Sequence, residues 1–133
     1  MEKDRFLNEI NLNEYAKTLF ERKNESIELY WADCDSKEWS PKVKECHKNV
    51  TELGNMNSEL EPVRGWLMID GEKSVVFVAH SVVKNVDGKF YDITPPNNGP
   101  RPPFIIANDN EETFEKMVMY VGDIIYHPNS QNA

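Results

Sequence analysis

Cysteine is scarce in this chain, which holds only Cys34 and Cys46 among its 133 residues. Two cysteines, in a sequence whose first residues lack the apolar stretch of a secretion signal, predict free thiols in a reducing cytoplasm. Asp33, Cys34, Asp35 and His47 suggest a metal at first sight. Because no Cys-x-x-Cys or His-x-x-x-His spacing accompanies them, we expect no metal site.

Long apolar runs, clustered glycines and basic stripes are also missing. No apolar run approaches the roughly 20 residues of a transmembrane helix, so we expect no membrane association. The six glycines are dispersed, which excludes a Gly-rich phosphate loop, and we expect no cofactor. The 15 Lys and Arg residues are scattered against 23 Asp and Glu, a net charge of −8 that argues against nucleic-acid binding. A basic protein or peptide, or an amine-bearing substrate, fits this charge better, although the same charge also serves solubility.

What remains is an ordinary globular composition, with 39% hydrophobic and 29% charged residues. This length supports one hydrophobic core rather than two. We therefore expect a single α+β domain over residues 1–128 and a disordered tail over residues 129–133.

Helical patterns lie in the first half of the chain. Residues 3–22 carry an apolar stripe at helical spacing, and Asn11 with Glu14 resembles a capping box at which the helix restarts. A second helix carries Cys46, Val50 and Leu53 on the face that should meet the sheet, and it ends near Gly54. It begins either at Ser40-Pro41, a favourable N-terminal pair, or at Cys46 if residues 41–45 form a loop.

Strand patterns dominate the second half. Residues 63–69, 74–84 and 89–93 predict a three-stranded antiparallel meander on which the Cys-bearing helix packs. A proline-rich surface loop should follow over residues 94–103. Shorter strands are expected over residues 26–32 and 104–106, and residues 111–126 read as a helix to Met117 and then as a strand from Met119.

The most informative segment is the hairpin that carries His80 and Asp92. Strongly strand-forming residues precede His80, and Asp87-Gly88 marks the turn. A three- or five-residue loop centred on Val86 sets His80 opposite Asp92, with their Cβ atoms about 5 Å apart on one face. A two-residue Asp87-Gly88 turn would set Asp92 opposite Val83 instead.

A carboxylate beside an imidazole suits acid–base chemistry on a thiol. Cys46 has an ordinary pKa of about 8.5 unless a base or a helix N-terminus favours its thiolate. His80 would supply the base and Asp92 would orient its ring. The alternative for each residue is structural: Cys46 as a small core residue, His80 as a satisfied core histidine, and Asp92 as part of a turn.

Three segments carry a wider pattern. They are Cys46-His47-Lys48-Asn49-Val50 on a predicted helix, Gly65-Trp66 on a strand, and Gly88-Lys89-Phe90-Tyr91-Asp92-Ile93-Thr94-Pro95 on the strand after His80. In this order the chain resembles the papain-like cysteine hydrolases, especially their transglutaminase-like branch. The resemblance covers residues 46–95 and departs from the family where Ser81 and Val82, rather than an aromatic residue, follow His80.

The resemblance implies a papain-like fold and a cysteine acyl-transfer enzyme acting on an amide, a peptide or a glutamine side chain. It implies Cys46 as the nucleophile, His80 as general base and acid, and Asp92 as the residue that orients it. Trp39, Ser40 and Trp66 are candidates for the substrate pocket. The alternative is a non-enzymatic binding or inhibitor protein on the same scaffold, which acts through its acidic surface and the loop over residues 94–103.

Overall fold

The structure of the protein, a computed structural model, describes residues 1–128. It has a mixed α+β architecture, as predicted, with a six-stranded sheet and four α-helices. The tail expected over residues 129–133 lies outside the described residues.

The sheet is built on one long antiparallel hairpin. Strands β2 (Glu61–Asp70) and β3 (Val75–Lys84) pair along their whole length, and β4 (Phe90–Asp92) continues the predicted meander on the other edge of β3. Strand β5 (Phe104–Ile106) pairs antiparallel with β2. Two further strands extend the sheet: β1 (Tyr30–Trp31) lies parallel to β4, and β6 (Ile124–Tyr126) pairs antiparallel with β3.

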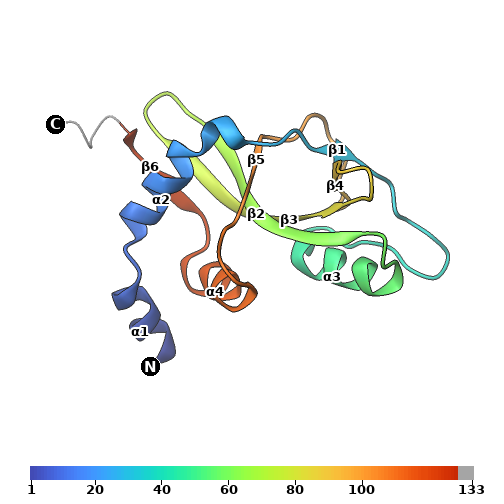
Figure 1. Ribbon diagram of the computed structural model, residues 1–133, viewed down its shortest axis with the longest axis horizontal. Coiled ribbons are helices and arrows are strands. Elements are labelled where there is room, and N and C mark those ends of the chain that lie inside the picture. Colours follow the sequence, from blue (N-terminus) through green and yellow to red (C-terminus); the bar gives the residue numbers. More distant parts are fainter. Residues whose placement is uncertain (129–133) are drawn as a thin grey trace.

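The helices cover different parts of this sheet (Figure 1). Helix α3 (Cys46–Met56) packs near β4, where Val50 and Leu53 belong to a core cluster with Val83 and Ile93. Helices α2 (Leu12–Glu21) and α4 (Glu111–Lys116) pack toward the other end of the hairpin, around a core centred on Trp66 and Phe77. The apolar face predicted for the Cys-bearing helix therefore does meet the sheet.

The N-terminal prediction of a restarting helix is confirmed. Helix α1 (Glu2–Glu9) ends before Asn11, whose side chain accepts a hydrogen bond from the Glu14 amide at 3.0 Å and opens α2. A short 3₁₀ turn, η1 (Lys23–Glu25), follows. The strand expected over residues 26–32 is reduced to the two residues of β1, with an isolated bridge from Ile27 to Phe104.

The hairpin register differs from both predicted ones. Val83 pairs with Tyr91 and Lys84 with Phe90, so Asp92 lies level with Val82. A three-residue loop, closed by Asn85 and Lys89 and centred one residue later than expected, causes the shift. Gly88 takes the positive φ of 84° that this turn needs. Because the shift is two residues in pairing, Asp92 still shares a face with His80, as its diagonal neighbour.

The segment after α4 also departs from prediction. Residues 117–121 form η2 (Met117–Val121), a π-helical turn that ends at Gly122 with φ 76°, and the strand β6 starts only at Ile124. Within residues 1–128, helices of the length and apolar character needed to span a bilayer are absent.

Candidate functional site

Cys46 is the first residue of α3, so the helix start at Ser40-Pro41 is not the one adopted. The Asn49 side chain explains why. Its Oδ1 accepts from the Lys42 amide at 2.9 Å, and its Nδ2 donates to the Lys42 carbonyl at 2.8 Å and to Thr94 Oγ1 at 3.0 Å. These bonds satisfy the loop backbone without a helix and tie it to the residues that follow Asp92.

The loop before α3 ends in a strained conformation. Lys44 is the only non-glycine residue with positive φ (66°) in the described chain. The first backbone bond of the helix runs from the Asn49 amide to the Glu45 carbonyl at 2.8 Å. The amides of residues 46–48 therefore precede it and point out of the N-terminal end, where positive dipole potential favours a negative charge.

A gap in the sheet brings Cys46 to His80. On one edge of β3, β4 pairs at Val83 and Lys84 and β6 pairs at residues 75–77. In the described chain no strand pairs with the stretch between them on that side, and the loop before α3 reaches His80 and Asp92 there. A helix on one face of the sheet can thus deliver its first side chain to a histidine of the hairpin.

His80 and Asp92 form a close, shielded pair. Nε2 of His80 lies 3.1 Å from Oδ2 of Asp92, and the two side chains are only 13% and 5% exposed. The distance is that of an ion pair, although the Nε2–H is not well aligned with that oxygen. With Nε2 on the carboxylate, Nδ1 is the ring nitrogen left for the thiol.

The Cys46 thiol is in contact with two imidazoles, those of His47 and His80. Burial by itself raises the pKa of Cys46, but the hydrogen bonds and charges of the two rings outweigh it and lower this pKa to about 6. Burial lowers the pKa of His80, but Asp92 and Cys46 raise it to about 9. The two shifts, downward for the thiol and upward for the imidazole, both favour a thiolate–imidazolium pair.

Asp92 is held from two further directions. Burial opposes its charge, yet His80, Arg101 and the Thr94 amide together hold its pKa below the ordinary value. Arg101 Nε donates to Oδ2 at 2.9 Å, and the Thr94 amide donates to Oδ1 at 3.1 Å. The guanidinium also bonds three residues of its own proline-rich loop and lies over the Trp31 ring. The loop of residues 94–103 is thereby fastened to the site.

A hollow of about 320 Å³ opens beside this arrangement. His80, Asp92 and Arg101 line it, together with Lys44 and prolines of the 94–103 loop. It gives a ligand access to the imidazole from solvent.

The predicted pocket residues lie elsewhere. Trp66 is fully buried and donates to the Tyr15 hydroxyl at 3.0 Å, so it belongs to the core and not to a pocket wall. Trp39 packs on the α3 core and donates to Glu52 at 3.1 Å. Ser40 bonds Asp35 and lines a separate hollow with Trp31.

Two neighbours of the site, Asn49 and Arg101, escaped the sequence reasoning as functional residues. Asn49 carried a usable signal, because a polar residue three positions after Cys46 falls on the buried stripe of the helix. Arg101 gave none, since one arginine in a proline-rich loop has no pattern. His47, one of only three histidines in the sequence, is the second candidate for a base after His80, and its Nδ1 lies 2.5 Å from the buried Ser81 Oγ.

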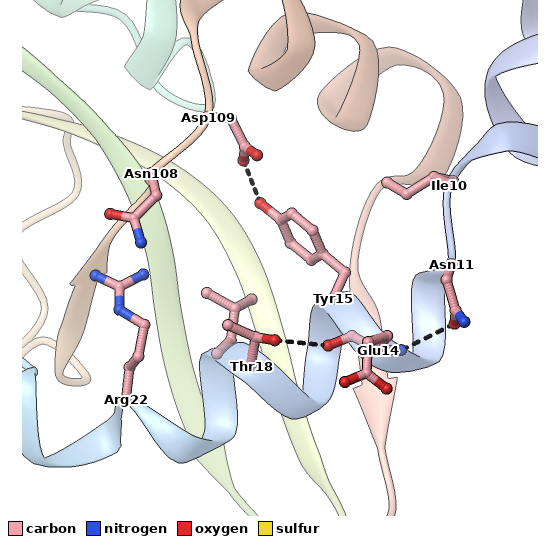
Figure 2. A pocket seen from close by; sticks show the side chains of 9 residues that line it. Ile10, Asn11, Glu14, Tyr15, Thr18, Arg22, Asn108 and Asp109 are labelled. Atoms are coloured by element: carbon pink, nitrogen blue, oxygen red, sulfur yellow. Dashed lines mark hydrogen bonds between the residues drawn. The ribbon is translucent and has the colours of Figure 1, made fainter.

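Another hollow, of about 340 Å³, lies beside α2 and is lined by Tyr15 and Asp109 among others (Figure 2). There the Tyr15 hydroxyl points at Asp109, with 2.5 Å between the oxygens. Burial and the Asp109 carboxylate raise the pKa of Tyr15 above its ordinary range, so the phenol stays protonated. This hollow has no cysteine or histidine in its lining.

In residues 1–128, no group of three or more His, Cys, Asp and Glu side chains is arranged to hold a metal ion. Comparisons with protein-family models, with curated proteins and with solved structures found no match to this chain. The interpretation of the site therefore depends on its own residues.

Proposed function

We propose that the protein is a cysteine acyl-transfer enzyme of papain-like, transglutaminase-like type, with Cys46 as nucleophile. One observation carries the proposal: the Cys46 thiol, the His80 ring and the Asp92 carboxylate, from three separate elements, are in contact in that order. Thiol activation by an imidazole that a third group orients is the recurring arrangement of such enzymes.

In the proposed reaction the Cys46 thiolate attacks the carbonyl carbon of an amide, and the carbonyl π pair moves onto oxygen. Amides at the start of α3, including that of Cys46, stabilise the resulting oxyanion. His80 then gives its proton to the leaving nitrogen as the C–N bond breaks, which leaves a thioester on Cys46. Attack by water or by an amine releases the acyl group, so hydrolysis, deamidation and transamidation differ only in substrate and acceptor.

The surroundings favour a protein or peptide substrate. The hollow beside His80 is open to solvent, and the chain carries a net charge of −8, which attracts a basic partner. A cytoplasmic location is part of the proposal, because a thiolate at neutral pH needs a reducing compartment to escape oxidation.

Acylation by p-nitrophenyl acetate tests this function. We expect a burst of p-nitrophenolate and an acetyl group located on Cys46 by mass spectrometry. Cys46→Ala should abolish the burst with an unchanged circular dichroism spectrum, whereas Cys34→Ala, the matched control, should retain it. Acetylation of Cys34 at the same rate as Cys46 would contradict the proposal and leave the binding or inhibitor protein as the better interpretation.

A further inference from the structure

His47 is the second imidazole on the Cys46 thiol, and its hydrogen bonds fix its proton. The Arg64 guanidinium can only donate, and its Nη1 donates to Ser81 Oγ at 3.0 Å. The remaining neighbour of this buried hydroxyl is His47 Nδ1, at 2.5 Å. All three groups are satisfied when Ser81 donates to Nδ1, which places the ring proton of His47 on Nε2.

The same guanidinium also holds the first turns of α3. Arg64 Nη1 also donates to the His47 carbonyl at 3.0 Å, and Nη2 donates to Thr51 Oγ1 on the next turn of α3 at 2.7 Å. The His47 ring meets Phe114 edge-on, with 5.7 Å between centroids. These contacts fix both the backbone and the ring of the residue that follows the nucleophile.

The two histidines therefore have different hydrogen-bond partners and suit different roles in the proposed reaction. Asp92 beside His80 favours an imidazolium that can give up a proton. The Ser81 hydroxyl occupies Nδ1 of His47, so this ring offers its Nε2–H to groups beside the Cys46 thiol. His80 and His47 both interact with the Cys46 thiol, yet they line different hollows, of about 320 and 370 Å³.

This placement leaves one role for the Nε2–H of His47. The leaving nitrogen has to face His80 to receive its proton, so the carbonyl oxygen of the same substrate turns away from His80. On that side lie the amides at the start of α3 and the His47 ring. We propose that His47 Nε2–H donates a hydrogen bond to the oxyanion that forms when Cys46 attacks a carbonyl group. The inference rests on the function proposed above.

Two probes separate this role from a role on the thiol. p-Nitrophenyl acetate reacts through an oxyanion: sulfur bonds to the carbonyl carbon, the oxyanion collapses and p-nitrophenolate leaves. Iodoacetamide reacts by direct displacement of iodide from its CH₂ group, and no oxyanion forms. Rates are compared at the plateau of each pH profile, so that a change in thiol ionisation does not contribute.

His47→Phe keeps an aromatic ring against Phe114 and removes the N–H, whereas His47→Gln keeps a neutral N–H near the Nε2 position. We expect His47→Phe to slow acylation about 100-fold, the effect of losing one oxyanion donor. We expect His47→Gln to recover much of that loss, and both variants to keep the wild-type alkylation plateau. Ser81→Ala should also slow acylation and leave the alkylation plateau unchanged. It replaces His47→Phe as the test if that variant fails to fold.

Three outcomes overturn the inference. Equal losses in acylation and alkylation would make His47 a partner of the thiolate only. Unchanged acylation in His47→Phe, or in Ser81→Ala, would leave the ring without a catalytic role. If the wild-type protein itself shows no burst, the proposed function fails and this inference fails with it, whereas a wild-type burst with unaffected variants overturns the inference alone.

Discussion

At the scale of single residues, the charges of the site depend on one another. Asp92 favours the cationic form of His80, and that cation favours the Cys46 thiolate. Arg101 shares the same Asp92 oxygen with His80, which prevents the carboxylate from being drawn wholly to the imidazole. A substitution of Asp92 should therefore change the pKa of Cys46 through His80, without direct contact between Asp92 and the thiol.

Asp92→Asn tests this coupling. Without the carboxylate, the pKa of His80 falls and its positive charge is lost at a lower pH. The thiolate of Cys46 is then less favoured, so the pKa of Cys46 rises. We expect the midpoint of the pH profile for Cys46 alkylation to move upward by about one pH unit, equivalent to about 1.4 kcal/mol.

Asp87→Asn is the matched control, because this carboxylate is exposed in the turn of the same hairpin. It should leave the midpoint where it is. A downward shift in Asp92→Asn, or equal shifts in the two variants, would show that the carboxylate does not act through His80.

Individual residues of the site were predictable from the sequence where their chemistry is rare. The chain has three histidines and two cysteines, so Cys46 and His80 stood out, and the Asp92 hairpin added the carboxylate. The exact pairing was not predictable, because loops that differ by one residue in position have similar turn chemistry. The contact of Arg64 with Thr51 was not predictable, because it joins a strand to a helix and no local pattern specifies how the two pack.

At the scale of elements, the start of α3 decides where the Cys46 thiol lies. Ser40-Pro41 is a favourable helix start, yet the amide and carbonyl of Lys42 are hydrogen-bonded to the Asn49 side chain and not within a helix. A helix that began at Pro41 would leave Cys46 more than one turn inside, away from the free amides. The sequence left both starts open because the deciding contact is with a side chain further along.

Asn49→Ala tests this anchoring. The side chain makes three hydrogen bonds and is 2% exposed, so its loss leaves the Lys42 groups and Thr94 without their partner. We expect the free energy of unfolding, measured by urea denaturation with tryptophan fluorescence, to fall by about 1–3 kcal/mol. The acylation rate should fall as well, because the loop before Cys46 loosens.

Asn55→Ala, at an exposed position of the same helix, provides the comparison and should change stability by less than about 0.5 kcal/mol. If Asn49→Ala were as stable as Asn55→Ala, the buried amide would not hold the loop.

At the scale of the whole molecule, the site exists only where distant segments converge. The meander of β2, β3 and β4 was predictable, because alternating apolar residues and turn signals are local. The parallel pairing of β1 with β4 and the return of β6 to β3 were not, because such pairings have no short-range signal. These two additions matter, since β6 and β4 frame the stretch of β3 at which Cys46 meets His80.

Alkylation of the two cysteines of one molecule by iodoacetamide tests the central claim most directly. Burial and the nearby Asp33 raise the pKa of Cys34, whereas that of Cys46 is lowered to about 6. In the folded protein at pH 7, Cys46 should react much faster than Cys34, with a midpoint near pH 6. The advantage should vanish in concentrated urea and diminish in His80→Ala. A Cys46 that reacts no faster than Cys34, or as fast without His80, would contradict the account.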